Sequence, residues 1–146
     1  MRKIPRILFL CTGNSCRSQM AEGWARHLGG DRVVADSAGT EAHGKNPRAL
    51  AVMAEAGVDI SGQASTAVTG EMIGNADLVV TVCGDADRNC PVLPQGTRRL
   101  HWPLADPARA TGTEDEIMRQ FRATRDEIER RVRELLEQLA NEGCVQ

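Results

Sequence analysis

Short apolar runs alternate with amphipathic stretches along most of this chain, and that alternation limits the fold more than any other feature. Runs rich in Val, Ile and Leu that are bounded by turn residues are typical of strands buried on both faces of a parallel sheet. We identify such runs at residues 7–10, 33–35, 78–82 and, more weakly, 100–102. Strands separated by helices predict an α/β fold with a doubly wound parallel sheet, whose ligand site lies beyond the carboxyl ends of the strands.

Helices are expected between and after these strands. Residues 18–28 carry apolar side chains at spacings of three and four before two glycines, a second helix opens at Pro47, and a third, short one is centred on residues 71–76. The longest follows Thr113, which can form a capping box with Glu116. Its apolar stripe consists of Ile117, Phe121, Ile128, Val132, Leu135, Leu136 and Leu139.

Length and charge exclude several classes of protein. A chain of 146 residues fits one domain, residues 1–146, and its net charge of -2 argues against a broad basic surface for nucleic acid. No stretch approaches the roughly 20 apolar residues of a membrane span, and the apolar run near the N-terminus leads into a turn instead of a cleavage site. We therefore expect a cytoplasmic monomer. The five cysteines, an odd number in a reducing compartment, indicate chemistry more than a disulfide framework.

The first strand runs directly into the sequence CTGNSCRS, residues 11–18, and a helix follows. A loop at a helix N-terminus offers backbone N–H groups and the positive end of a dipole to a tetrahedral oxyanion. Gly13 and Asn14 can adopt the positive φ angles that turn amides inward, and Arg17 can clamp two anion oxygens. The same field should lower the pKa of Cys11 and make it a nucleophile, with Ser18 as a hydrogen-bond donor. The expected oxyanion-binding residues are Thr12, Gly13, Asn14, Ser15, Cys16, Arg17 and Ser18.

This loop, followed by QMAE, resembles the signature of the low-molecular-weight protein tyrosine phosphatase superfamily, and specifically of its thioredoxin-coupled arsenate reductase branch. The resemblance continues through SAG at 37–39, HGKNP at 43–47, Asp-Pro at 106–107 and the terminal helix. It implies a flavodoxin-like three-layer fold with a four-stranded parallel sheet. It also implies arsenate as substrate, with phosphate or sulfate as analogues, thioredoxin as electron donor, and no tightly bound cofactor.

Two further cysteines distinguish a reductase from a phosphatase. Cys83 follows the third strand, and Cys90 comes seven positions later in a polar segment. Reduction of arsenate needs two electrons, which a thiol pair supplies by forming a disulfide. The hypothesis is that Cys11 attacks arsenic, Cys83 attacks Cys11 to release arsenite, and Cys90 attacks Cys83 to leave a disulfide that thioredoxin reduces. Residues 84–89 would rearrange as that bond forms.

The other cysteines are expected to be less involved. Cys16 is interpreted as a packing residue of the loop and Cys144, in the polar tail, as a bystander. The cysteines lack the closely paired spacing that is usual for zinc, so no metal site is predicted.

The resemblance implies roles for several polar residues. Asp106 would be the general acid, and Asn14 and Ser37 would support the loop. In relatives, residues matching Asn14, Glu22 and Ser37 join an Asp to bind potassium. Here Thr66 stands where that Asp would fall, so one ligand of a potassium site is missing.

Two other functions remain open at this stage. A tyrosine phosphatase would use Cys11, Arg17 and Asp106 in the same way, but this chain has no Tyr and two Phe, and Gln19 replaces the Pro that is common after Arg-Ser. A redox or phosphate-sensing binding module with a damaged site is the second alternative, although nucleophile, clamp and acid are all present. A glutathione and glutaredoxin route is an alternative to thioredoxin. His43 is left outside the catalytic set.

Overall fold

A parallel sheet of four strands forms the centre of the computed structural model, which describes residues 4–88, 90 and 92–145. The strands are β1 (Arg6–Cys11), β2 (Val34–Gly39), β3 (Leu78–Thr81) and β4 (Arg98–His101), in the order β2-β1-β3-β4. Every pair is parallel, and the register places Cys11 beside Gly39 and Leu10 beside Thr81. The carboxyl ends of the strands therefore meet at one edge, where a ligand site was predicted.

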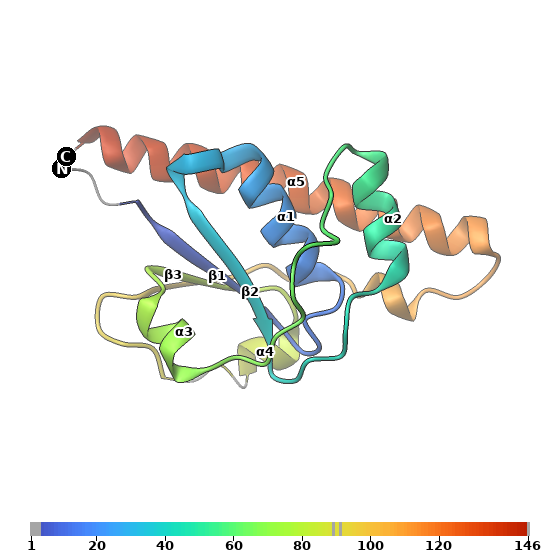
Figure 1. Ribbon diagram of the computed structural model, residues 1–146, viewed down its shortest axis with the longest axis horizontal. Coiled ribbons are helices and arrows are strands. Elements are labelled where there is room, and N and C mark those ends of the chain that lie inside the picture. The colour runs from blue at the N-terminus through green and yellow to red at the C-terminus, as the bar shows by residue number, and fades with distance from the viewer. Residues whose placement is uncertain (1–3, 89, 91, 146) are drawn as a thin grey trace.

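Helices cover both faces of this sheet, giving the three layers and the flavodoxin-like arrangement that were expected (Figure 1). On one side lie α1 (Arg17–Gly29), α2 (Pro47–Glu55) and α5 (Glu114–Val145), with α1 packed against β1, β2 and α5. On the other side, α3 (Gly70–Asn75) and α4 (Gly84–Arg88) contact β1. Two short 3₁₀ helices, η1 (Gly30–Arg32) and η2 (Pro107–Arg109), follow α1 and β4.

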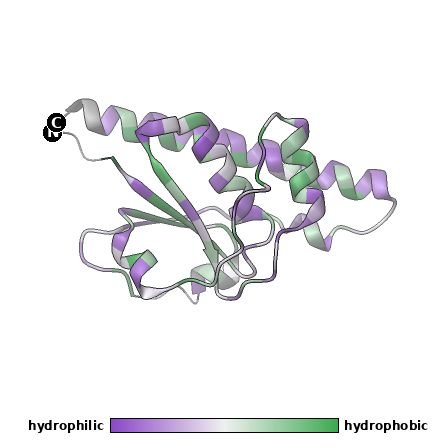
Figure 2. Ribbon diagram, in the orientation of Figure 1, coloured by the Kyte–Doolittle hydropathy of each residue, from purple (hydrophilic) through white to green (hydrophobic). Residues whose placement is uncertain are grey.

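The core lies between these layers. Residues 7–11 of β1 are all buried because both faces of the strand are covered, which explains why its sequence is a continuous apolar run. Phe9 from the sheet and Phe121 from α5 are 0% exposed. Figure 2 shows hydrophobic residues along the strands and recurring hydrophilic residues along α5. Among the described residues, no helix combines the length and apolar character needed to cross a membrane.

The predicted elements are confirmed, with differences at the sheet edges and after β3. β2 continues to Gly39, beyond the predicted end at residue 35, because its polar residues find partners in neighbouring elements. The fourth strand was expected to be buried at residues 100–102, and this was wrong. β4 begins at Arg98 and is largely exposed because it is an edge strand paired only with β3, while the buried Trp102 follows it. α4, in the segment after Cys83, was not predicted as a helix.

Candidate active site

The loop between β1 and α1 turns its carbonyl groups outward. Four of its carbonyls accept hydrogen bonds of 2.9 to 3.1 Å from N–H groups of the segment after β2. The pairs, carbonyl first, are Cys11 and Thr40, Thr12 and Glu41, Gly13 and His43, and Ser15 and Asn46. Because a trans peptide points its C=O and N–H in opposite directions, the N–H groups of the loop face its interior. The backbone thus presents converging donors of the kind that bind an oxyanion.

The first turn of α1 differs from those of the other α-helices with described caps. Asn46, Thr69 and Thr113 cap α2, α3 and α5 by accepting main-chain N–H bonds with their side chains. At α1 the cap position is Cys16, which makes no such bond, and the first turn contains no acidic residue. The N–H groups and the dipole at this end are therefore directed at the loop interior, where they favour an anion.

Cys11 lies at the end of β1 within a set of hydrogen bonds. Its Sγ accepts the Asn14 main-chain N–H at 3.2 Å and lies 2.8 Å from the Ser18 Oγ. The Asn14 side-chain amide donates to that same Oγ at 2.9 Å, which leaves the Ser18 hydroxyl hydrogen available to the sulfur. These contacts orient the Cys11 sulfur, which is the candidate nucleophile of the loop.

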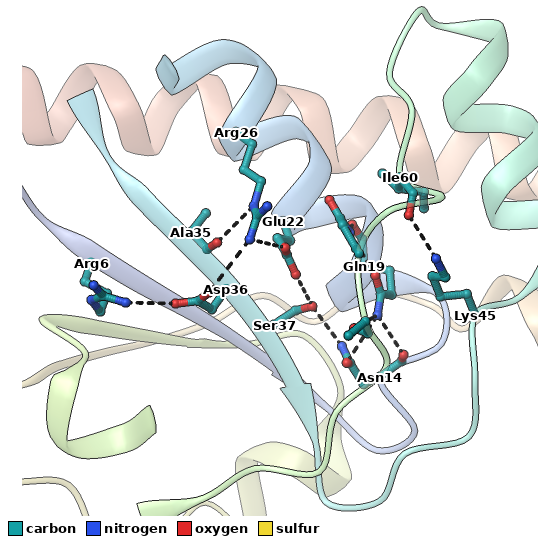
Figure 3. A network of polar contacts seen from close by, with 12 residues as sticks. Arg6, Asn14, Gln19, Glu22, Arg26, Ala35, Asp36, Ser37, Lys45 and Ile60 are labelled. Atoms are coloured by element: carbon teal, nitrogen blue, oxygen red, sulfur yellow. Dashed lines mark hydrogen bonds and ion pairs between the residues drawn. The ribbon is translucent and has the colours of Figure 1, made fainter. Parts of the chain in front are cut away.

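Asn14 holds the loop in shape. Its φ of 46° is the one left-handed conformation at a non-glycine residue among those described. The side-chain Oδ1 accepts the Thr66 main-chain N–H at 2.7 Å, while the Nδ2 donates to Ser37 at 2.9 Å. Ser37 in turn donates to Glu22 at 2.6 Å (Figure 3). These buried contacts offset the strain of the left-handed backbone and give Asn14 and Ser37 the supporting roles expected of them.

Gly39 allows β2 to approach the loop closely. A Cβ built at this position would lie 2.5 Å from the Thr12 carbonyl oxygen and 2.6 Å from the Asn14 main-chain nitrogen. Real Cβ atoms do not come so near to backbone atoms. The glycine in the SAG sequence is therefore required by the position of the loop.

A cavity of about 540 Å³ opens above the loop. It brings together residues that are far apart in sequence, including both Cys11 and Cys83. The predicted site residues that line it are Cys11, Thr12, Gly13, Ser15, Cys16, Arg17, Cys83 and Asp106. Asn14 and Ser18 are 0% exposed and support the cavity from behind, while Cys90 is not part of its lining.

Five cavity residues were not in the predicted site. Gly84 and Ala108 have small or no side chains, and the other three, which have basic side chains, are His43, Arg88 and Arg109. His43 belongs to the HGKNP sequence and its Nε2 lies 2.5 Å from a Glu41 carboxylate oxygen. Arg109 follows Asp106 by three positions, and Arg88 ends α4. No periodicity or spacing in the sequence singles out either arginine. Arg88 and Arg109, together with Arg17, give the cavity a cationic rim suited to an anionic substrate.

Arg17 and Asp106 contact each other at the edge of the cavity. The Arg17 Nη1 donates to the Leu104 carbonyl at 3.0 Å, and its Nη2 lies 3.5 Å from Asp106 Oδ2. The other Asp106 oxygen accepts the Ala108 N–H at 3.0 Å, which fixes the carboxyl at the start of η2. The segment after β4 thus orients both the guanidinium and the carboxyl.

Cys83 and Cys90 lie at opposite ends of α4. The Cys83 Sγ lies 3.3 Å from the Thr12 hydroxyl and accepts the Ala86 N–H at 3.4 Å, so this thiol contacts both the anion loop and the first turn of α4. Cys90, beyond the other end of the helix, is half-buried. Of the two cysteines beside α4, Cys83 is therefore the one that shares the cavity with Cys11.

Cys16 is a different kind of thiol. It is 6% exposed, and burial, with a smaller contribution from Asp106, raises its pKa from 9.0 to about 12. A thiol that stays protonated at neutral pH is a poor nucleophile. This agrees with the packing role that the sequence suggested.

Asn14, Glu22 and Ser37, which match potassium ligands in relatives, are not arranged to bind a cation here. The Asn14 Oδ1 accepts N–H bonds from Thr66 and Gln19, and its amide nitrogen, not its oxygen, faces Ser37. The Glu22 carboxylate accepts from Ser37 and pairs with Arg26 at 2.7 Å. The Thr66 N–H fixes the orientation of the amide, since a flipped Asn14 would place two donors face to face. The described residues also contain no group of three or more His, Cys, Asp or Glu side chains that could hold a metal ion.

Comparison with known proteins identifies the family. Residues 6–145 match the family model of the low molecular weight phosphotyrosine protein phosphatases. This chain belongs to that family. It is 55% identical to an arsenate reductase of Bacillus subtilis (strain 168) over 131 residues, which cover 90% of this chain and 94% of that protein.

Solved structures in the family include both reductases and phosphatases. A thioredoxin-dependent arsenate reductase of Corynebacterium glutamicum superposes with a TM-score of 0.74 at 33% identity, over 95% of this chain and 63% of that one. The arginine phosphatase YwlE of Geobacillus stearothermophilus superposes with a TM-score of 0.80 at 26% identity, over 97% of each chain. The fold is thus shared by both activities, and the choice between them rests on the side chains of the site.

Proposed function

We propose that this chain reduces arsenate to arsenite, with Cys11 as the nucleophile and Cys83 and Cys90 as the thiols that complete the two-electron transfer. The observation that carries the proposal is that Cys83 lines the same cavity as Cys11, above an anion-binding loop. Hydrolysis of a phosphate ester needs Cys11 but not Cys83. The high identity to a bacterial arsenate reductase supports the same conclusion.

The first step forms a bond between sulfur and arsenic. The loop N–H groups and the Arg17 guanidinium bind the arsenate oxygens. The Cys11 thiolate attacks arsenic, and one arsenic–oxygen bond breaks. Asp106 lies beside Arg17 at the cavity edge, and its carboxyl supplies a proton so that the oxygen leaves as water.

The second step transfers the electrons. The Cys83 thiolate attacks the Cys11 sulfur, and a sulfur–sulfur bond replaces the sulfur–arsenic bond. The electron pair of the broken bond stays on arsenic, which leaves as arsenite, reduced from As(V) to As(III). The contact between Cys83 and the Thr12 hydroxyl supports this order, because it brings the second thiol to the loop that carries the first.

The third step returns Cys11 to its starting state. Cys90 attacks the Cys83 sulfur, Cys11 leaves as a thiolate, and a disulfide joins Cys83 to Cys90. A helix rises about 1.5 Å per residue, so helical geometry across these seven positions would separate the two Cα atoms by about 10 Å, whereas a disulfide needs them within about 7 Å. We therefore infer that α4 unwinds in this step.

Thioredoxin is the proposed reductant of this disulfide, and the Corynebacterium glutamicum relative is described as dependent on it. Cys90 is half-buried outside the cavity, where a partner protein reaches it more easily than Cys11. Arsenite formation with a purified thioredoxin system should exceed that with a glutathione and glutaredoxin system. Faster arsenite formation with the glutathione and glutaredoxin system would identify that system as the electron donor.

A cytoplasmic location and a monomeric state stay predictions. Size-exclusion chromatography can test the monomeric state.

A tyrosine or arginine phosphatase is the second candidate, favoured by the superposition on YwlE. The two functions separate in one experiment that compares Cys83→Ser and Cys90→Ser with the parent protein. Steady-state arsenite formation should be lost in both, whereas hydrolysis of an aryl phosphate, where measurable, should persist because it needs only Cys11, Arg17 and Asp106. Cys144→Ser serves as the matched control. Arsenite turnover that survives both changes would exclude the relay.

A further inference from the structure

Arg26 extends from α1 toward β2 and contacts three acceptors (Figure 3). Its Nη2 lies 2.7 Å from the Glu22 carboxylate, one turn earlier on the same helix, and 3.8 Å from Asp36. Its Nε donates to the Ala35 carbonyl at 3.1 Å. Asp36 is in turn bound by Arg6 at 3.3 Å. A side chain shared among an α1 carboxylate and two groups of β2 is more firmly oriented than one in a simple surface ion pair.

The contact matters because Glu22 is buried. The side chain of Glu22 is 6% exposed, whereas that of Arg26 is 54% exposed. A carboxylate removed from water is costly unless it is paired and hydrogen-bonded. Glu22 meets this need with the Ser37 hydroxyl on one oxygen and the Arg26 guanidinium on the other. Without Arg26, the contact left to Glu22 among the described residues would be the neutral Ser37 hydroxyl.

An unbroken chain of hydrogen bonds leads from this carboxylate to the reacting sulfur. Because Ser37 donates its hydrogen to Glu22, its lone pairs are left for the Asn14 amide, which binds at 2.9 Å. The same amide group binds Ser18, and Ser18 binds the Cys11 Sγ. The carboxylate thus sets the direction of the Ser37 hydroxyl, and the Asn14 amide connects that hydroxyl to Ser18 and the sulfur.

We infer that Arg26 is a positioning residue for the oxyanion loop, acting as a built-in cation that holds Glu22, Ser37 and Asn14 in their working orientation. In relatives from the thioredoxin-coupled arsenate reductase branch, the residues that match these three help to bind potassium. Here the Asn14 amide turns its nitrogen to Ser37, and a guanidinium occupies the open side of the carboxylate. The charge that a cation would bring is thus supplied by the protein, and the loop should not need potassium.

The test compares phosphate binding to the reduced protein for three variants at Arg26. Arg26→Ala should weaken phosphate binding, measured by isothermal titration calorimetry, by at least about three-fold, the size expected for loss of a partly screened charge-assisted hydrogen bond. Arg26→Gln, which keeps an N–H donor but no charge, should weaken it equally. Arg26→Lys should recover part of the affinity because an ammonium can still pair with Glu22. The Gln and Lys variants decide the matter if the Ala variant does not fold.

Arg32→Ala is the matched control. Arg32, in η1, also binds main-chain carbonyls, those of Leu28 and Gly29, but contacts no member of the chain to Cys11. Its phosphate affinity should equal that of the parent protein. In turnover, Arg26→Ala should raise the KM for arsenate by the same factor as the phosphate dissociation constant and change kcat less. A general loss of structure would instead lower kcat and the thermal midpoint together.

Potassium provides the second readout. Exchange of NaCl for KCl at constant ionic strength should change phosphate binding to the parent protein by less than about three-fold, since no ion has to complete the network. A larger gain in phosphate affinity with KCl would overturn the inference. So would a change in affinity below three-fold in both Arg26→Ala and Arg26→Gln, or a phosphate affinity of Arg26→Lys no better than that of Arg26→Ala. The turnover readout rests on the proposed function, but the phosphate readout does not. Failure to form arsenite would therefore count against the function alone.

Discussion

The anion loop and the segment from Cys83 to Cys90 line or adjoin the same cavity, but they are held very differently. In the loop, main-chain carbonyls are paired with the irregular segment that follows β2, and Asn14 and Ser18 are fully buried. The other segment contains a five-residue helix, and its second cysteine is only half-buried. Donors that must meet a transition state gain from being fixed in advance, whereas a thiol pair that starts too far apart gains from a helix of low stability. One cavity thus combines a closely held binding part with a part that the proposed relay requires to rearrange.

The largest expected effect comes from removing the Cys11 thiol of the anion loop, which should affect arsenite formation far more than phosphate binding. Cys11→Ser should lower arsenite formation at least about a thousandfold, because a hydroxyl is far less nucleophilic than a thiolate. Phosphate binding should stay within about ten-fold, since the loop N–H groups and Arg17 supply the contacts. Calorimetry and an arsenite assay measure the two. Loss of both together would mean that the sulfur is itself needed to keep the loop in shape.

The next test adds a methyl group where β2 packs closely against the anion loop. Gly39→Ala places a methyl group against the Thr12 carbonyl and the Asn14 nitrogen, at 2.5 and 2.6 Å. We expect a loss of about 2 kcal/mol in the free energy of unfolding, as for an overpacked site, and a fall of about 4 to 8 °C in the thermal midpoint. Phosphate affinity should fall along with it. Unchanged binding and midpoint would show that the loop is more yielding than its hydrogen bonds indicate.

A comparison of two cysteines sharpens the contrast. The pKa of Cys16 is raised to about 12, so the folded chain keeps a proton that the unfolded chain loses above pH 9. Stability from this thiol is therefore complete below pH 9 and falls as the pH rises toward 12, by about 2 kcal/mol at pH 10.5. Urea unfolding at pH 8 and pH 10.5 should show this alkaline loss in the parent protein and a smaller one in Cys16→Ser.

Alkylation provides the companion measurement for these cysteines. With iodoacetamide at pH 8, mass spectrometry should find Cys90 modified well before Cys16, because only Cys90 is half-buried and Cys16 stays protonated. Equal rates would remove the distinction between the two regions.

The smallest expected effect concerns the segment that rearranges. Gly84 is exposed in α4, and a Cβ there would meet only the Arg88 side chain, at 3.4 Å. Gly84→Ala should stabilise the helix by about 0.5 to 1 kcal/mol and slow formation of the Cys83–Cys90 disulfide roughly two- to five-fold. Release of arsenite in a single turnover should not change, since it precedes that step. Faster disulfide formation in the variant would contradict unwinding of α4.

Much of this arrangement could be read from the chain before any fold was known. The apolar runs of β1 and β3 and the stripe of α5 are local patterns, and the capping box is present as expected, with Thr113 accepting the Glu116 N–H at 3.2 Å. The anion loop was recognisable because its cysteine, glycine and arginine stand between a strand and a helix. By contrast, β4 was misjudged as buried, since exposure at a sheet edge depends on what lies beside the strand.

The order of the residues was enough to predict candidates for the chemistry: a nucleophile, a clamp, an acid and two further thiols at recognisable positions. Which of these side chains meet depends on the fold. The fold places Cys83 next to Thr12. It also places Arg109 on the cavity rim and links Arg26 through Glu22 to the loop. The physical reason is that hydrogen-bonded side chains are matched across segments distant in sequence, and such pairings leave no local periodicity to read.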